Sequence, residues 1–169
     1  TEEFIIIVYL IIEEIYPTIV SEPLRKRGFP PALTDIEIIT MQIVGECLKM
    51  DTDKSIWMFF KNNYLSWFPH LGSYPNFCKH CANLWQVHQK ITAQLTAHYG
   101  QDHIHFIDGF PIPVCRYSRA KRHKNFKEHA GFSYCAARQE ECCGFKGHLV
   151  INLGGMITGY TFAPANVDE

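Results

Sequence analysis

The sequence lacks the features that mark several large classes of protein. Its longest unbroken apolar run covers only residues 4–12, whereas a membrane-spanning helix needs about twenty apolar residues. The N-terminal residues are acidic where a secretory signal needs cations. The glycine-rich motifs that bind phosphates or dinucleotides do not occur, and neither does the G-x-S-x-G motif of hydrolases. We therefore expect no membrane association, no P-loop enzyme and no dinucleotide-dependent enzyme.

The composition is that of an ordinary globular protein. The chain has 169 residues, of which 47% are hydrophobic, and its formal net charge is -1. Any binding of nucleic acid would therefore have to come from a local concentration of cations. The seven cysteines are an odd number, and without a secretory signal they predict free thiols in the cytoplasm. Because the chain lacks an initiator methionine and stops in what reads as the start of a helix, we expect a fragment of a longer protein.

Residues 1–99 are predicted to form a helical unit, because their apolar residues recur at helical spacing. The second helix has the clearest start: Thr34 and Glu37 have the spacing of a capping box. Four helices are predicted. The first covers 4–16, the second follows Thr34, the third covers 53–68 and the fourth covers 76–98 and ends before Gly100. The predicted buried stripe of the second helix consists of Ile36, Ile39, Ile43, Val44 and Leu48. Four prolines are predicted to interrupt the linker before it: Pro17, Pro23, Pro30 and Pro31.

From His103 onward the pattern changes to that of strands, so residues 100–169 are predicted to form a second domain. Strands are expected over 103–114, 147–153 and 155–163. The last two are joined by Gly154-Gly155, a dipeptide typical of hairpin turns. A helix is expected from about residue 165.

Asp108 is the first candidate for chemistry. It ends a short apolar run and precedes a glycine, a position where α/β folds commonly keep a metal ligand or a general base. Asp-Gly is equally common at the start of a turn. The local sequence leaves both interpretations open, and a single carboxylate needs partners to hold Mg²⁺.

A dense basic segment follows the strand that carries Asp108. Its cations, interleaved with Tyr117, His123 and Phe126, suit contacts with phosphates together with stacking or packing on sugars and bases. The alternative is a solvated loop without function. Because the segment leaves the strand that carries Asp108, we expect the cations and the carboxylate to lie close together. The candidate DNA-binding residues are Arg116, Arg119, Lys121, Arg122, Lys124 and Lys127.

The cysteines allow a zinc site but favour it weakly. Cys78 and Cys81 have C-x-x-C spacing, and Cys142 and Cys143 could supply a second pair. However, Cys78 and Cys81 fall inside a helical pattern, where cysteines pack as small hydrophobic residues. We expect packing there and keep a zinc protein as an alternative.

Several segments resemble the DDE transposases of bacterial insertion sequences. The strand motif is IDGFPIPVC at 107–115, and the resemblance continues through GFKGHLVINLGGMITGYTFAPANVDE at 144–169. PALTDIEIITMQIVGE at 31–46 and FFKNNYLSWFPHLGSYPNFCKH at 59–80 resemble the N-terminal region of the same group. The resemblance implies an α+β chain. It would have an N-terminal helical, DNA-binding unit over 1–99, followed over 100–169 by the truncated first half of a ribonuclease-H-like mixed sheet: the strands expected over 103–114, 147–153 and 155–163 and then a helix.

The resemblance also implies a function. Asp108 becomes the first of three catalytic acids that together bind two Mg²⁺ or Mn²⁺ ions, which promote cleavage of DNA and strand transfer. Asp168 falls where the family places no catalytic acid, and the other two acids are expected after Glu169, so this chain alone is expected to be inactive. The implied partners are the insertion-sequence ends and target DNA, with a homodimer or larger assembly on DNA, in the bacterial cytoplasm and on the nucleoid. The alternative is a non-catalytic DNA-binding module with an incomplete active site.

Overall fold

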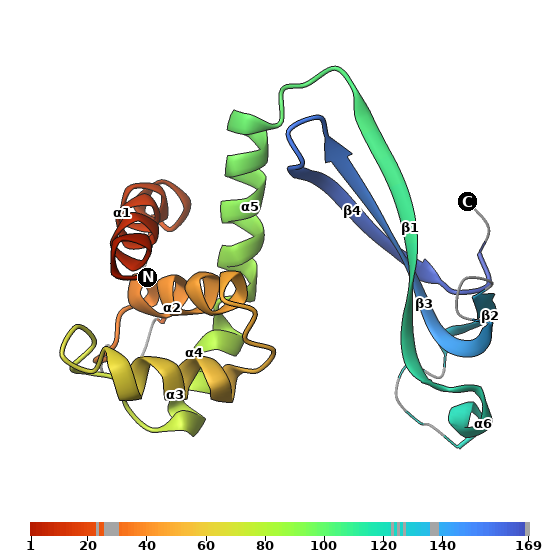
Figure 1. Cartoon of the computed structure of the whole chain (residues 1–169), viewed down its shortest axis with the longest axis horizontal. Helices are drawn as coiled ribbons and strands as arrows, with labels where there is room; N and C mark the ends of the chain where they lie inside the picture. Colours follow the sequence, from red (N-terminus) through yellow and green to blue (C-terminus); the bar gives the residue numbers. More distant parts are fainter. Residues whose placement is uncertain are drawn as a thin grey trace. The chain divides into compact units, whose positions relative to one another are not determined.

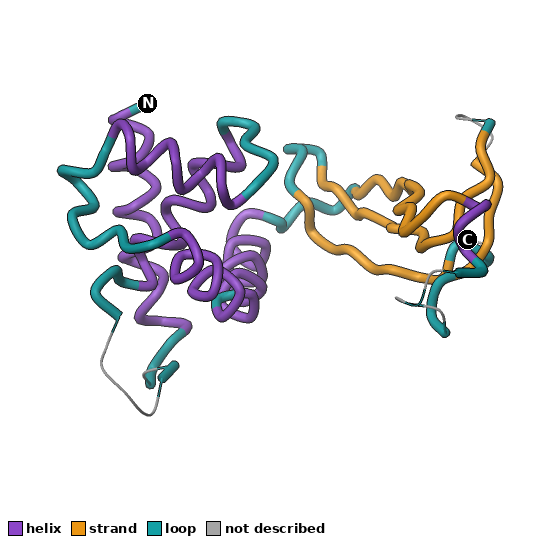
Figure 2. The backbone as a smooth tube through the Cα atoms, turned by 90° about the horizontal axis from the view of Figure 1, so that it is seen from below, coloured by secondary structure: helices purple, strands orange, loops and turns teal. Residues whose placement is uncertain are grey.

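Helices occupy the first part of the chain and strands the second (Figure 1). The computed structural model describes residues 1–22, 24, 25, 31–122, 124, 126, 128–135 and 139–167, apart from the side chains of Cys135, Glu140 and Cys142. The chain divides into two units, Thr1–Gln94 and Leu95–Glu169. This division falls inside helix α5 (Trp85–Tyr99), whereas the boundary predicted from the sequence lies at the end of that helix. Figure 2 shows helices in the first unit and mainly strands in the second, which also contains the end of α5 and the short helix α6 (Tyr117–Ala120).

The first unit is built around helix α2 (Asp35–Cys47), which packs against α1 (Glu2–Ile19), α3 (Asp53–Asn63) and α4 (Tyr74–Asn83). The predicted capping box of α2 is confirmed: the Glu37 amide donates to Thr34 Oγ1 at 3.2 Å, and the Thr34 amide donates to Glu37 Oε2 at 2.7 Å. The predicted stripe is wrong in part, because Leu48 is exposed and Ile36 and Ile43 are only half-buried. Because α2 is contacted by helices on more than one side, it buries a broader face than a single stripe. The buried residues of α2 are Ile38, Ile39, Thr40, Met41, Val44 and Gly45.

Three predicted helix boundaries are wrong. Pro17 lies in the last turn of α1 instead of ending it; the helix loses the hydrogen bond that the Pro17 amide would donate but continues only to Ile19. α3 ends at Asn63, and Phe68 folds back to pack edge-on against Phe60 with ring centroids 5.1 Å apart. The helix predicted over 76–98 is two helices, α4 and α5, with a break at Leu84, whose side chain is fully buried. None of the helices in the described residues is long and apolar enough to cross a membrane.

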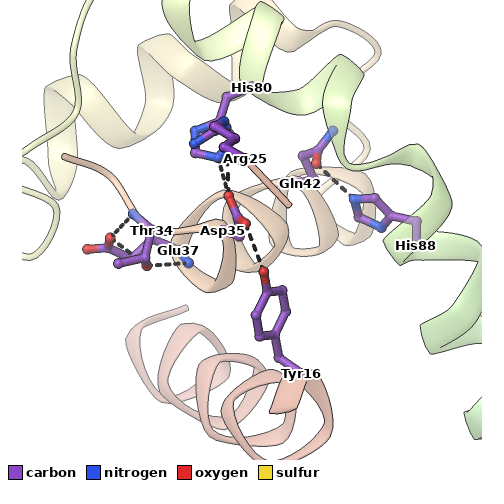
Figure 3. A network of polar contacts seen from close by, with 8 residues as sticks. All are labelled: Tyr16, Arg25, Thr34, Asp35, Glu37, Gln42, His80 and His88. Atoms are coloured by element: carbon purple, nitrogen blue, oxygen red, sulfur yellow. Dashed lines mark hydrogen bonds and ion pairs between the residues drawn. The ribbon is translucent and has the colours of Figure 1, made fainter. Parts of the chain in front are cut away.

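A polar network ties the first residue of α2 to its neighbours (Figure 3). Tyr16 Oη of α1 donates to Asp35 Oδ2 at 2.8 Å, His80 Nε2 of α4 hydrogen-bonds to Asp35 Oδ1, and Arg25 lies 3.9 Å from the same oxygen. Burial by itself would raise the pKa of Asp35, but the hydrogen bonds from His80 and Tyr16 outweigh burial and lower it. Asp35 is therefore a charged acceptor that joins three segments.

Replacing Asp35 with alanine should destabilise the protein by about 2–3 kcal/mol at pH 7, because the buried His80 and the Tyr16 hydroxyl lose their acceptor. A carboxyl with a lowered folded pKa contributes stability above its unfolded pKa of about 3.9 and loses that contribution as pH falls through the folded value. The difference between wild type and variant should therefore shrink below about pH 4. Urea unfolding, monitored by circular dichroism, measures this difference in unfolding free energy, and a variant of the exposed Asp51, Asp51→Ala, is the control. Equal stabilities at pH 7 would contradict the role of the network.

A second polar contact links α2 to α5 within the same unit. His88 Nε2 lies 2.9 Å from Gln42 Oε1 (Figure 3). Burial lowers the pKa of His88, so the neutral ring, donating from Nε2 to the amide oxygen, is the form that the fold favours.

The described residues of the second unit form an antiparallel sheet centred on the long strand β3 (Glu140–Asn152). β1 (His105–Arg116) pairs with one edge of β3 along most of its length. The other edge pairs with β2 (Gly131–Cys135) at the beginning of β3 and with β4 (Ile157–Pro164) at its end. Figure 1 shows β1 and β4 flanking β3. The α+β class is as predicted.

The strands differ from the prediction in length and number. β1 continues to Arg116 and contains Pro111 and Pro113, which are tolerated because β1 lies at the edge of the sheet. The predicted strand over 147–153 is the second half of β3, and β2 was not predicted. Ala165 and Asn166 form a turn where a helix was expected to begin, and Asp168 and Glu169 lie outside the described residues.

The predicted turn between the last two strands is confirmed. Gly155 has a φ of +80°, a backbone conformation that glycine adopts without steric cost. Its amide donates to the Asn152 carbonyl at 3.0 Å, and the Met156 amide donates to Asn152 Oδ1 at 2.8 Å. The hairpin thereby sets the register of β3 against β4.

Candidate functional site

Asp108 lies within β1, opposite Leu149 of β3, which in turn lies opposite Tyr160 of β4. Residues that face one another across antiparallel strands project from the same face of the sheet, so these three side chains form a row across it. Phe106 and Phe110, two residues away on either side, share that face. Asp108 is thus an exposed carboxylate among apolar and aromatic side chains.

The surroundings of Asp108 fit one metal ligand. Its Oδ1 accepts a hydrogen bond from the Gly109 amide at 2.8 Å, and Oδ2 has no hydrogen-bond partner among the described residues. A carboxylate oxygen open to solvent is the ligand that Mg²⁺ prefers. In the described part of the chain, however, no group of three or more His, Cys, Asp or Glu side chains could hold a metal ion. These residues therefore offer one ligand and do not form a complete metal centre.

The basic segment is only partly a loop. Arg116 ends β1, Arg119 lies in α6, and the turn that follows carries Lys121 and Arg122. These residues and Lys124 are exposed, and none forms an ion pair with a described acid. Lys127 and His123 lie outside the described residues. The five described cations are therefore accessible to an anionic partner.

Two aromatic residues of the segment pack on the sheet. Tyr117 contacts Phe132 of β2 edge-on, with centroids 5.5 Å apart, and Phe126 contacts Phe145 of β3 at 5.6 Å. Ala120 of α6 is buried. These contacts hold the polypeptide that carries the cations against the sheet, so the cations are presented from an anchored surface.

The expectation that the cations lie beside Asp108 is wrong for Arg116, the first of them. β1 continues for eight residues from Asp108 to Arg116, paired with β3 to its end. At about 3.3 Å per residue the two ends of this stretch are ~26 Å apart. That the cations follow the strand of Asp108 in sequence does not bring Arg116 close to the carboxylate, because an extended strand carries its far end away.

A small pocket beside Gly109 was not predicted. It has a volume of about 170 Å³ and is lined mainly by Phe110, Tyr134, Phe145 and Lys146. Aromatic rings next to a lysine can contact the bases and phosphates of a nucleic acid. No local signal in the sequence could have identified this pocket, because its lining comes from β1, β2, β3 and the turn after β4, and β2 was not predicted.

The C-x-x-C motif lies in α4 and takes part in the core. Cys81 is buried, and burial, followed by the nearby Asp53 and Cys78, raises the pKa of its thiol to about 12. His80, between the two cysteines, is engaged by Asp35. Cys47, Cys78, Cys81, Cys115 and Cys143 form no disulfide. The expected packing of Cys81 is therefore observed.

The comparisons with known proteins concern the second unit. Residues 99–169 match the family model of a transposase DDE domain. No curated protein and no solved structure matches the chain. The match includes β1 with Asp108 and all the described cations of the basic segment.

Proposed function

Because residues 99–169 match the family model of a transposase DDE domain, we propose that this chain is part of a transposase that cuts and joins DNA. The observation that carries the proposal is the exposed Asp108 carboxylate, in a strand of that domain, with one oxygen open to a ligand. The source we propose is a bacterial insertion sequence, and the fold we propose for the complete domain is ribonuclease-H-like. The protein would act in the cytoplasm, on the nucleoid.

Asp108 is proposed as one of the ligands of a site that takes two Mg²⁺ or Mn²⁺ ions in the complete enzyme. Bound there, the ions supply the positive charge that stabilises the attacking and leaving oxygens of phosphodiester displacement. Asp108 itself contributes a fixed position, because β1 is paired with β3 on both sides of it. A ligand held by a paired strand needs little reorganisation when the site assembles.

The basic segment is proposed to bind the DNA backbone at a distance from the reaction. The ~26 Å of strand between Asp108 and Arg116 corresponds to roughly seven or eight base-pair steps of B-DNA at 3.4 Å each. Arg116, Arg119, Lys121, Arg122 and Lys124, with Lys127, would then position a duplex whose reacting phosphate lies at Asp108. We assign recognition of the terminal repeats to the helical unit, and we expect a homodimer or larger assembly on DNA.

The proposed function is tested on the full-length protein that contains this chain. It should cleave DNA carrying the ends of its own element in the presence of Mg²⁺ or Mn²⁺, and chelation by EDTA should stop the reaction. Gel analysis of end-labelled duplexes measures the cleavage. Absence of metal-dependent cleavage on element ends would contradict the proposal.

Residues 1–169 by themselves should not cut DNA, because the proposed site needs three carboxylates and the described residues contain no group of three or more potential metal ligands. Conversion of supercoiled plasmid to the nicked form, with Mg²⁺ or Mn²⁺, provides the measurement, and the Asp108→Ala variant is the control for contaminating nuclease. Nicking that depends on both the metal and Asp108 would show that this expectation is wrong and would make Asp168 a candidate ligand.

A non-catalytic DNA-binding module is the second candidate. The observation that favours it is that no group of three or more potential metal ligands, with Asp108 or elsewhere, occurs among the described residues. In that case the full-length protein would bind DNA with the salt dependence of a basic surface and show no cleavage in any divalent metal.

A further inference from the structure

The helical unit contains a pocket that the proposed site does not use. It has a volume of about 440 Å³ and lies between the residues that precede α2, the loop before α4 and α4 itself. Leu33 and Phe77 form part of its apolar wall. The polar residues that line it are Arg25, His70, Asn76, Lys79, His80 and Asn83.

The polar lining of this pocket is suited to an anion. It combines two permanent cations, Arg25 and Lys79, with two imidazoles and two amides, and no Asp or Glu is among the lining residues that the structure describes. Asp35 does not line the pocket; it accepts hydrogen bonds from His80 and Tyr16 and lies 3.9 Å from Arg25, so Lys79 is the lining cation without an ion pair among the described residues. The pocket therefore presents hydrogen-bond donors and positive charge without an opposing acid in its wall.

Several of these groups are held in place without a ligand. Arg25 lies 3.9 Å from Asp35, and His80 hydrogen-bonds to the same carboxylate (Figure 3). The loop before α4 is fixed by Trp57 Nε1, which donates to the Gly72 carbonyl at 3.0 Å. Donors that are ordered beforehand lose less conformational entropy on binding. Lys79 remains exposed at the entrance.

We propose that this pocket binds a phosphate group of the DNA backbone. The assignment to DNA rests on the proposed function, since a transposase must hold duplex outside its reaction centre. Phosphate matches the lining because its oxygens accept several hydrogen bonds at once and its charge is opposite to that of Arg25 and Lys79. Free phosphate has the same chemistry, so the test must separate the two sources.

The test compares Lys79→Gln with Lys90→Gln in residues 1–169. Both lysines are exposed on helices of the first unit, and Lys90 does not line the pocket. Duplex binding is measured across a salt titration, with thermal melting to verify that both variants fold. Lys79→Gln should weaken binding to unrelated sequences equally and reduce the slope of log K against log salt by about 1, whereas Lys90→Gln should leave the slope unchanged.

Three results would overturn the assignment, and they are distinguishable. Identical slopes in wild type and Lys79→Gln would show that the pocket does not contact DNA, while leaving the proposed function intact. Stabilisation by inorganic phosphate that Lys79→Gln abolishes, with unchanged DNA binding, would make it a site for free phosphate. A wild-type chain that binds no duplex even at low salt would contradict the DNA-binding role proposed for the chain itself.

Discussion

Replacing Asp108 with asparagine in the full-length protein should reduce metal-dependent DNA cleavage by about a thousandfold, equivalent to ~4 kcal/mol of transition-state stabilisation. Asparagine keeps the shape of the side chain and its oxygen can still accept from the Gly109 amide. It removes the negative charge that a divalent cation needs. Because Asp108 is exposed and makes no other described hydrogen bond, the fold should not change.

A measurement of DNA binding distinguishes a loss of catalysis from a loss of the folded structure. The Asp108→Asn enzyme should bind duplex at least as tightly as wild type, because a carboxylate that repels phosphate has been removed. Asp102→Asn is the matched control: this residue is also exposed and lies in the segment that precedes β1. Quantified cleavage of labelled element ends, with Asp102→Asn at wild-type activity, gives the comparison. Retained cleavage in Asp108→Asn would rule out Asp108 as a metal ligand.

Neutralising Lys121, Arg122 and Lys124 together should weaken duplex binding at every sequence and flatten its salt dependence by up to ~3 units of slope, because each phosphate that a cation neutralises contributes about 0.9 to the slope. All three are exposed, and the neighbouring segment is anchored to the sheet through Tyr117 and Phe126. Substitution by glutamine should therefore remove charge without releasing the segment.

A charge-preserving variant provides the control. Lys121→Arg, Arg122→Lys and Lys124→Arg together keep the number of cations and should keep the wild-type slope. Binding is followed on a duplex with the terminal repeat and on a random duplex, because preference for the repeat should survive in the glutamine variant if the helical unit reads the sequence. An unchanged slope in the glutamine variant would mean that the segment is a solvated surface without a role in binding.

Features that depend on residues close together in the chain could be predicted from the sequence. The Thr34–Glu37 capping box and the turn at Gly154-Gly155 are both observed, because each requires only contacts within about four residues. The strand motif around Asp108 likewise indicated the transposase resemblance, and the family model matches the region that contains it.

Features that depend on distant residues were decided by the tertiary structure. The sequence predicted that the cations lie near Asp108, but pairing of β1 with β3 runs to Arg116 and places this first cation at the far end of the strand. His80 lies inside the C-x-x-C motif of α4, yet its hydrogen-bond partner is Asp35, 45 residues away in the chain. The basic pocket of the helical unit likewise combines residues from separate segments. Local propensity specifies where an element begins, but the partner strand or helix determines how long it runs and which side chains meet, because burial and pairing stabilise more than propensity does.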